Sequence, residues 1–324
     1  MRPLDFASVS PSLSGVSFPI FPYSYSSRGF PDVWERLKLF RDSNPVYLVS
    51  LYDATYHLPW SSFSSEEPKI RFWDSGGFEA FAEDDNTGAY PLSNGSHPWS
   101  QSLYLEAAKK IPWNGKDILV NFDDCSREAE VSRQVGCALE LFGMVKGQFY
   151  RDLLIHVPFS TDPALLVEQL APHFGDFHIL GLTEKDIAPT WVHGVKFLSR
   201  LRQSLNAKAG RYVPIHIFGC LDPKTVTRFA FAGADIFDGL TWQRFFIRNG
   251  KALYRHEAQY VIEPSLLNSP NNLVKWTLDH NISTLEELRT NLTYAFGTED
   301  FQAFQQEKQD VDYALTQFPA RRNP

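Results

Sequence analysis

The sequence is poor in cysteine and has no long hydrophobic run. Its three cysteines, Cys125, Cys137 and Cys220, are far apart, and without a CxxC pair they predict neither a disulfide framework nor a four-thiolate metal site. The N-terminus has a single Arg followed by serines and prolines in place of a continuous apolar segment, and no later stretch reaches transmembrane length. We therefore expect a protein of the reducing cytoplasm that has no membrane partner.

The sequence also lacks an excess of basic charge. Its formal net charge of −7 counts against a protein that coats nucleic acid by neutralising phosphates over its whole surface. A local basic patch is compatible with this balance, because Arg244, Arg248, Lys251 and Arg255 lie close together in the chain. Such a cluster can position a nucleic-acid backbone, and it can equally be a solvated loop face.

Apolar runs and segments with helical spacing alternate along the chain. Hydrophobic residues make up 43% of the 324 residues, enough to bury a large core, and we expect one domain over 1–324. Continuous apolar runs suit strands that are buried on both faces. They lie at 46–53, 69–77, 117–124, 153–159, 177–182, 214–219 and 235–240. The helical segments between several of these runs predict a parallel α/β fold.

A (β/α)8 TIM barrel is the architecture that we expect, although these runs supply only seven strands. The eighth strand lies either at 19–24 or in the stretch after Gly250. A doubly wound open sheet is the competing architecture, but no GxGxxG motif follows the first strand as a dinucleotide-binding sheet would require.

Carboxylates stand at the end of one apolar run after another. They are Asp53, Asp74, Asp123 with Asp124, and Asp238. In a barrel the carboxyl ends of all strands open on one face, where the active site is built, so these side chains would converge. Asp is also a common helix cap or turn residue after a strand. Its recurrence at four strand ends favours a shared site.

The histidines do not predict a metal site. His57, His156, His178 and His216 lie in or beside predicted strands, and no two of them have the spacing of a motif such as HExxH. We expect packing or rim roles for them.

The segment 73–81, WDSGGFEAF, resembles the DSGGFQ signature of the tRNA-guanine transglycosylase family. Two glycines allow a tight turn and close approach to a flat ligand, and Phe78 offers a face on which a purine can stack. The resemblance implies that Asp74 is the second active-site carboxylate and that Phe78 lies against the base, with Ser75 in the same base-binding turn. Glu79 stands where the family has Gln.

Two further segments resemble motifs of the same family. The segment 117–125, DILVNFDDC, is similar to one in which the Asp after Phe reads the Watson–Crick edge of guanine, which implies that role for Asp123. The segment 233–238, GADIFD, resembles the strand that ends in the nucleophile, which implies that role for Asp238.

The resemblance also implies the remaining contacts and the reaction. It places the backbone at Gly181 and Leu182 against the base and Arg244 against a phosphate. Arg248, from the basic cluster, is predicted to contact the nucleic acid beside it. The implied activity replaces guanine in DNA or tRNA by a 7-deazaguanine derivative. A carboxylate attacks C1′, holds the nucleotide covalently and yields it to the incoming base.

The C-terminal part departs from the family. The segment 279–304 resembles the family's C-terminal segment, an HN pair leading into helices, and we expect a helical segment over about 268–324. The family holds a structural zinc with a CxCxxC cluster and the His of that pair, but no cysteine follows Cys220 here. We therefore expect no zinc, no zinc subdomain and no cofactor, with His280 as a helix cap or packing residue.

The base-binding region departs as well. Ile155-His156-Val157-Pro158 stands where the family has a V-Q-G motif, so a base contact is lost or supplied by His156. These departures place the chain in a divergent, zinc-less branch. Relatives of that kind include the DNA 7-deazaguanine transglycosylases and family-like proteins encoded beside antiviral defence genes, and the sequence does not choose between them.

Two alternatives stay open. One is a non-catalytic, family-like subunit or defence accessory protein that pairs with an active partner, and the retention of both Asp74 and Asp238 argues against it. The other is a barrel N-glycoside hydrolase that uses water as the acceptor. Phe78 and Asp123 favour base recognition without deciding between exchange and hydrolysis. A homodimer and a heteromeric assembly are both compatible with the sequence.

Overall fold

The computed structural model describes residues 17–44, 46–67, 69–81, 97–123, 130–265 and 269–317. Asp124 and Cys125 of the predicted base-reading segment therefore lie outside the described residues. Among the helices described, none is both long enough and apolar enough to cross a membrane.

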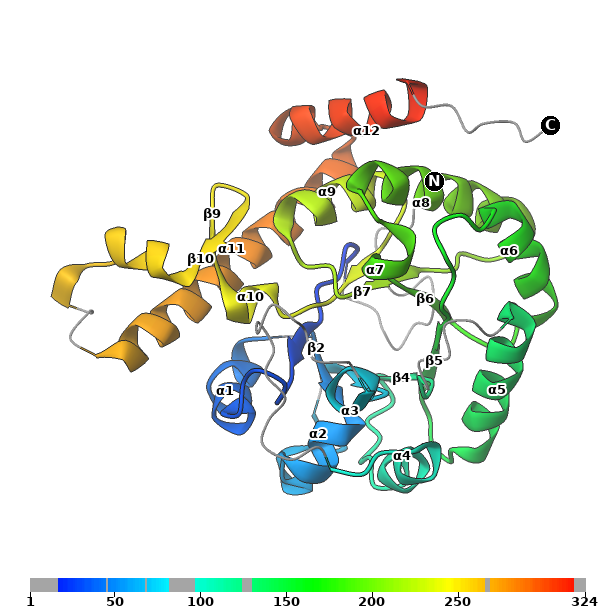
Figure 1. Cartoon of the computed structure of the whole chain (residues 1–324), viewed down its shortest axis with the longest axis horizontal. Coiled ribbons are helices and arrows are strands. Elements are labelled where there is room, and N and C mark those ends of the chain that lie inside the picture. Colours follow the sequence, from blue (N-terminus) through cyan, green and yellow to red (C-terminus); the bar gives the residue numbers. More distant parts are fainter. Residues whose placement is uncertain are drawn as a thin grey trace.

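Eight parallel strands form one sheet in sequence order, each paired with the next (Figure 1). They are β1 (Tyr23–Tyr25), β2 (Val46–Ser50), β3 (Ile70–Asp74), β4 (Asp117–Val120), β5 (Tyr150–Leu154), β6 (Ile179–Thr183), β7 (Ile215–Phe218) and β8 (Ile236–Phe237). Parallel bridges between Ile20 and Ile236 and between Tyr23 and Gly239 connect the last strand to the first. The α/β prediction is confirmed, and the curled sheet is that of a TIM-like fold.

Helices surround this sheet (Figure 1). They are α1 (Val33–Phe40), α2 (Leu51–Tyr56), α3 (Gly77–Phe81), α4 (Gln101–Ala108), α5 (Val131–Met144), α6 (Pro163–Leu170), α7 (Glu184–Ile187), α8 (Trp191–Lys208), α9 (Pro223–Phe231), α10 (Thr241–Arg244), α11 (Pro270–Thr298) and α12 (Gln305–Gln317). Short 3-10 turns are η3 (Arg41–Ser43), η4 (Trp60–Ser62), η5 (Ala171–His173), η6 (Arg255–Tyr260) and η8 (Gln302–Phe304). Two Asp-Pro pairs start helices: Asp162 caps α6 and Asp222 caps α9 through backbone N–H groups.

Of the two candidate positions for the eighth strand, the N-terminal one belongs to the parallel sheet. β1 overlaps the N-terminal candidate, 19–24, at Tyr23 and Ser24 and ends one residue beyond it. The stretch after Gly250 instead forms β10 (Lys251–Tyr254), which pairs with β9 (Phe245–Arg248) in a separate antiparallel hairpin. The prediction of a strand over 153–159 was displaced, because β5 begins at Tyr150 and includes the polar pair Arg151 and Asp152. An apolar-run criterion passes over such residues, and burial of the Asp152 carboxylate depends on a partner from another strand.

The core has two layers. One hydrophobic cluster gathers alternate residues of neighbouring strands, such as Ile70 and Phe72 of β3. A larger cluster lies between the sheet and the helices and includes Trp73 from the other face of β3. This alternation follows from the pleat of a strand, whose successive side chains point to opposite faces.

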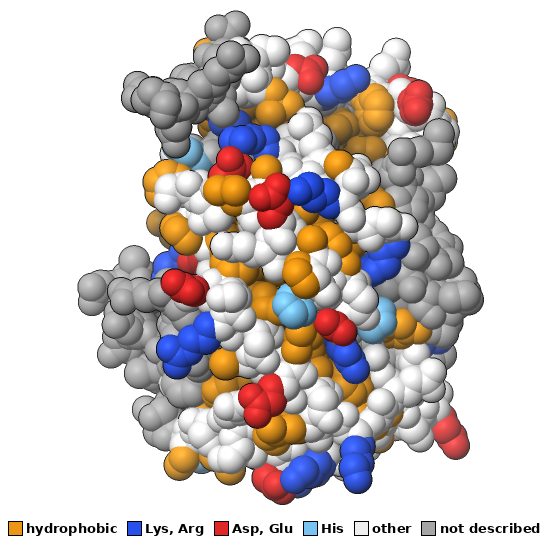
Figure 2. Space-filling model, turned by 90° about the vertical axis from the view of Figure 1, so that its right-hand side faces the viewer, with side chains coloured by type: hydrophobic (Ala, Val, Ile, Leu, Met, Phe, Trp, Pro, Cys, Tyr) orange, Lys and Arg blue, Asp and Glu red, His pale blue; other side chains and the backbone are white. Residues whose placement is uncertain are grey.

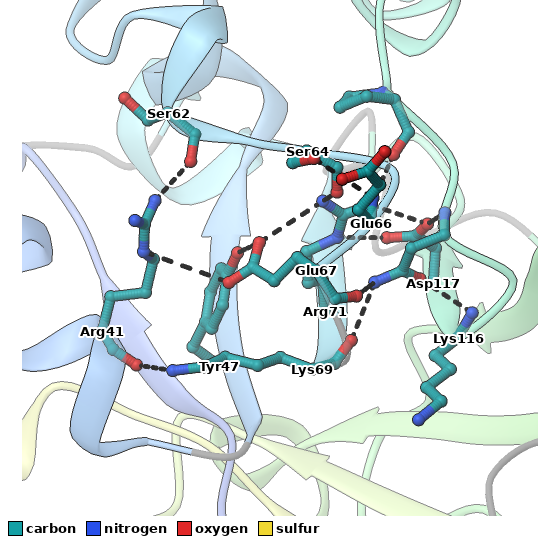
Figure 3. Close-up of polar contacts among 12 residues, drawn as sticks. Arg41, Tyr47, Ser62, Ser64, Glu66, Glu67, Lys69, Arg71, Lys116 and Asp117 are labelled. Atoms are coloured by element: carbon teal, nitrogen blue, oxygen red, sulfur yellow. Dashed lines mark hydrogen bonds and ion pairs between the residues drawn. The ribbon is translucent and has the colours of Figure 1, made fainter.

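A buried ion pair joins two neighbouring strands near their amino ends (Figure 3). Arg71 of β3 donates from Nε to Asp117 Oδ1 at 2.7 Å and from Nη2 to Asp117 Oδ2 at 2.9 Å. Both side chains are fully buried. Because the pair lies at the opposite end of the strands from Asp74, it supports the pairing of β3 and β4 rather than the predicted site.

The long helix α11 holds the hairpin and α10 against the sheet. Asn281 donates to the carbonyls of Trp242 and Phe245 and accepts from the N–H of Ile247. The HN pair lies inside α11, within the helical segment expected over about 268–324, and its side chains have partners outside the helix. His280 donates from Nε2 to the Ile247 carbonyl at 2.9 Å and its ring stacks on Trp276, which is a packing role.

Candidate active site

The predicted site residues lie at the carboxyl end of the parallel sheet, where its strands end. Asp74 is the last residue of β3, and Asp238 follows β8 directly. Asp123 follows β4 and His156 follows β5. Gly181 and Leu182 are placed differently from the rest, since both lie within β6 and before its end at Thr183.

Asp238 is surrounded by hydrogen-bond donors. Ser24 Oγ on β1 donates to its Oδ2 at 2.7 Å, and the Gly219 N–H after β7 donates to its Oδ1 at 3.1 Å. His216 Nε2 faces the same Oδ1 at 3.4 Å. The residue is only 6% exposed. Both oxygens of this buried side chain are therefore held by donors from neighbouring strands.

A second buried carboxylate stands behind His216. Asp152 Oδ2 lies 2.7 Å from His216 Nδ1, and both side chains are fully buried. Burial by itself lowers the pKa of His216, but the charges and hydrogen bonds of Asp152 and Asp238 raise it to about 9. The sequence prediction of a packing role for His216 missed this arrangement.

Gly181 makes room for that carboxylate. A Cβ on Gly181 would lie 2.7 Å from the Phe218 ring and 2.9 Å from Asp152 Oδ1. The Gly181 carbonyl accepts from the Ile155 N–H, and the Leu182 side chain is buried in the cluster between the sheet and the helices. Their predicted contacts with a base would be made by backbone alone and stay a prediction.

The turn after Asp74 is built by its glycines. Gly76 has a φ of +82°, in the left-handed region, and a Cβ there would lie 2.6 Å from Tyr52 Cβ. Ser75 is 2% exposed; its hydroxyl accepts from the Gly77 N–H and its carbonyl from Trp99 Nε1. Ser75 therefore shapes the turn that presents Asp74.

Replacing Gly76 by Ala is expected to destabilise the protein by roughly 2 kcal/mol or more, because the added methyl group meets Tyr52 and the residue must keep a left-handed φ. Gly115→Ala is the matched control, since Gly115 has a φ of +77° but its Cβ would meet nothing closer than 4.0 Å. Urea unfolding of both variants measures the difference. Equal losses would show that the contact with Tyr52 adds nothing.

Asp74 is set up to hold a proton. Burial raises its pKa first, and the negative charges of Glu79 and Asp238 raise it further, to about 8. The backbone N–H groups of Ser75 and Gly76 oppose this effect only in part. At neutral pH the Asp74 carboxyl group is therefore mostly protonated and can donate.

A buried acidic pair that the sequence did not predict lies next to Asp74. Asp53 in α2 is fully buried and accepts from the Ser27 N–H at 2.9 Å. Glu79 in α3 accepts from Ser26 Oγ at 2.5 Å. Burial raises the pKa of both carboxyl groups, and the negative charges of Asp74 on Asp53 and of Asp53 on Glu79 raise it further. Only the position of Asp53 after a strand could have signalled it.

Glu79→Gln is expected to make the protein more stable at pH 8. A raised pKa means that the folded state holds the proton more tightly, so stability falls as pH rises from the ordinary Glu value of 4.5 towards the folded value. The Gln variant does not lose this proton, and we expect its Tm at pH 8 to exceed that of the wild type by at least about 2 °C, because a pKa raised to about 8 removes more than roughly 1 kcal/mol of stability by that pH. Thermal unfolding between pH 5 and about 8 tests this, with the exposed Glu140→Gln on α5 as control; a parallel decline in all three proteins would contradict it.

The predicted base reader is held by a histidine. His156 Nε2 lies 3.1 Å from Asp123 Oδ1, and its Nδ1 lies 2.5 Å from Asp186 Oδ2. Burial lowers the pKa of His156, but these two carboxylates raise it to about 9. Gln134 in α5 fixes the backbone of His156 through both its N–H and its carbonyl. The structure thus brings together Asp123 and His156, both predicted as base-binding residues.

Phe78 stands at the same end of the sheet and is 40% exposed. The Arg28 guanidinium lies 4.8 Å from its ring centroid and donates from Nη1 to the Phe78 carbonyl at 2.6 Å. Arg28 is itself 2% exposed, so it fixes the position of Phe78. The sequence did not indicate this role, because Arg28 lies in a loop without periodicity.

The two predicted nucleic-acid contacts lie on α10 and β9, the elements that follow β8. Arg244 ends α10, with its guanidinium 5.4 Å from the Phe245 ring centroid. Arg248 ends β9, is exposed and faces Lys251 across the hairpin. Trp242 and Gln243, which precede Arg244, are buried and donate to the Ser24 carbonyl.

On the flank of α5 and α6, acidic and basic side chains are interspersed (Figure 2). The hairpin instead brings Arg248 and Lys251 together on adjacent strands. Two of the four basic positions predicted from the sequence are thus neighbours across the hairpin, whereas Arg255 donates to the Gln243 carbonyl.

Across the described part of the chain, no group of three or more His, Cys, Asp or Glu side chains is arranged to hold a metal ion. No protein-family model matches the chain, and no curated protein matches it.

Proposed function

We propose that the chain is a base-exchange transglycosylase that replaces guanine in a nucleic acid by a 7-deazaguanine derivative. The observation that carries the proposal is that two carboxyl groups at the carboxyl end of the sheet have different surroundings. Asp238 is surrounded by donors, whereas burial and nearby negative charge raise the pKa of Asp74 to about 8. A side chain whose oxygens are oriented by donors and a carboxyl group that holds a proton provide a nucleophile and a proton donor. The resemblance of the segments that contain them supports the same assignment.

In the first half-reaction, a carboxylate oxygen of Asp238 attacks C1′ of the target nucleotide. The C1′–N9 bond breaks through an oxocarbenium-like transition state, and its electron pair leaves with the base. The departing base takes the proton of Asp74. Ester formation also removes the negative charge of Asp238, one of the causes that raise the pKa of Asp74. Proton release from Asp74 is therefore coupled to attack by Asp238.

In the second half-reaction, the Asp74 carboxylate accepts the N9 proton of the incoming base. N9 then attacks C1′, and the ester bond to Asp238 breaks with its electrons returning to the carboxylate. Both carboxyl groups end in their starting states, so each turnover exchanges one base for another.

The base would be recognised by Asp123 and Phe78. A carboxylate can accept from both N1–H and the exocyclic amine of a guanine-like base, and an exposed aromatic ring can stack on it. His156 holds Asp123 in place from one side. Backbone at Gly181 and Leu182 completes the predicted set.

The proposed enzyme belongs to a zinc-less branch and uses no cofactor. His280 supports this, because its Nε2 donates to the Ile247 carbonyl and its ring stacks on Trp276. Its substrate is DNA or tRNA, and it works as a single barrel domain, as a homodimer or with a heteromeric partner.

Incubation of the full chain with radiolabelled guanine or 7-deazaguanine bases and either tRNA or duplex DNA tests the proposal. Label in one polymer would support base exchange and identify the substrate. Release of guanine from the polymer without uptake of label would instead establish an N-glycoside hydrolase. No label and no release, with folded protein, would favour the non-catalytic subunit.

Arg248→Ala is expected to weaken nucleic-acid binding and to reduce the salt dependence of affinity by about one phosphate contact. Arg248 is exposed beside Lys251, so its charge is available to a backbone. Fluorescence anisotropy at several salt concentrations measures both effects, with the exposed Arg133→Ala on α5 as control. Equal changes in the two variants would mean that the effect comes from net charge alone and not from a contact with Arg248.

A further inference from the structure

We propose that Asp152 and His216 form a positioning pair for the nucleophile, in which a doubly protonated His216 holds Oδ1 of Asp238 and leaves Oδ2 to attack C1′. This inference rests on the proposed function and adds to it the residues that orient Asp238. Neither residue belongs to the motifs that carry the resemblance to the transglycosylase family.

The geometry places one imidazole between two carboxylates. His216 Nδ1 lies 2.7 Å from Asp152 Oδ2, and Nε2 lies 3.4 Å from Asp238 Oδ1. An imidazole can donate from both nitrogens only when both carry a proton. A ring with a carboxylate at each nitrogen is therefore most stable as an imidazolium.

The ring has little freedom to turn. Phe218 packs over it with the two ring centroids 3.8 Å apart, and Phe72 packs against it edge to face at 5.3 Å. His216 and Asp152 are fully buried, so water does not compete for either contact. The direction of Nε2 towards Asp238 is thus set by packing as well as by charge.

The surroundings of the ring contain a limited set of polar groups. Asp152 faces it from β5 and Asp238 from the residue after β8, while β3 and β7 contribute Phe72 and Phe218. On β6, Gly181 has no side chain, and a Cβ there would lie 2.9 Å from Asp152 Oδ1. The two carboxylates are therefore the titratable groups that set the charge of His216.

Stability alone does not account for this arrangement. Taking charges out of water costs free energy that an ion pair often fails to recover, and apolar side chains fill a core more favourably. The contact from Nε2 to Asp238 is also longer than a full hydrogen bond, as catalytic contacts often are before substrate binds. A positive charge on His216 that orients Asp238 explains why buried charges are present here and why the contact is long before substrate binds.

The two oxygens of Asp238 then have different roles. Oδ1 is anchored by the Gly219 N–H and faces His216, whereas Oδ2 has the Ser24 hydroxyl, which can rotate away. Attack through Oδ2 forms the ester. When the ester breaks, negative charge returns to the carboxylate, and the imidazolium beside Oδ1 stabilises it there. His216 therefore acts most strongly on the second half-reaction.

NMR of protein with ¹⁵N-labelled histidine tests the pair without any assay of activity. We expect both ring nitrogens of His216 to stay protonated at pH 7 and to titrate with a pKa of about 9. Asp238→Asn should lower that pKa, because one of the two carboxylates is removed. His178 is an internal control, because burial and nearby arginines lower its pKa to about 4. A neutral His216 at pH 7, or one unaffected by Asp238→Asn, would overturn the proposal whatever the exchange assay gives.

Kinetics of Asp152→Asn give the second readout. We expect kcat to fall by about 10- to 100-fold, with KM for the incoming base unchanged and a larger fraction of enzyme trapped as the nucleic-acid ester. A lower kcat without accumulation of the ester would overturn the assignment to the second half-reaction. A charged His216 in an enzyme that exchanges no base would refute the proposed function and leave the ion pair with Asp238 standing.

Discussion

Asp238→Asn is expected to lower kcat for base exchange by roughly 10⁴-fold or more, as removal of a nucleophile does in other enzymes with covalent intermediates. An amide keeps nearly the same shape and can still accept from the Gly219 N–H, but it cannot form the ester with C1′. Uptake of radiolabelled base measures the loss. The covalent adduct with nucleic acid, seen on a denaturing gel with the wild type, should be absent.

The control for this variant is Asp312→Asn, which makes the same chemical change at an exposed position on α12. It should exchange base at the rate of the wild type. Retention of a tenth or more of the activity by Asp238→Asn would mean that another group attacks C1′, or that no covalent intermediate forms.

Asp74→Asn is expected to slow formation of the adduct by about 10²- to 10⁴-fold, the usual contribution of a general acid. The wild-type rate should also depend on pH in a defined direction. Asp74 donates only when it is protonated, and burial together with the charges of Glu79 and Asp238 raises its pKa to about 8. The single-turnover rate should therefore be constant below that pH and fall above it.

Single-turnover adduct formation isolates this step from release of product. In Asp74→Asn the decrease above pH 8 should disappear, because the titrating group is gone. The variant should lose less activity on a nucleic acid whose target base is a better leaving group. A decrease near pH 8 that persists in Asp74→Asn would assign it to a different group.

The parallel sheet could be predicted because strands buried on both faces are encoded as continuous apolar runs. Six of the runs contain a strand where it was expected, and β1 lies at one of the two positions proposed for the eighth. β5 was displaced, because Arg151 and Asp152 interrupt the apolar pattern at its start. Such residues are stable in a strand only through partners on distant strands, which local sequence does not contain.

The convergence of Asp74, Asp123 and Asp238 could be predicted for a related reason. The ends of parallel strands share one face, so a carboxylate after each strand is enough to place them together. The pairing of Asp152 with His216 could not be predicted. It depends on which inward-facing residues of β5 and β7 lie at the same level along the axis of the curled sheet. The proximity of Asp53 and Glu79 could not be predicted either, because it depends on how α2 packs against α3.

The contact between Ser24 and Asp238 has a consequence for synthesis of the protein. It joins the first strand to the residue after the last, across 214 positions of the chain. A nascent chain that leaves the ribosome therefore contains Ser24 long before the carboxylate it must orient. A chain interrupted before β8 would contain Ser24 but not Asp238, so the proposed base exchange could not begin in it.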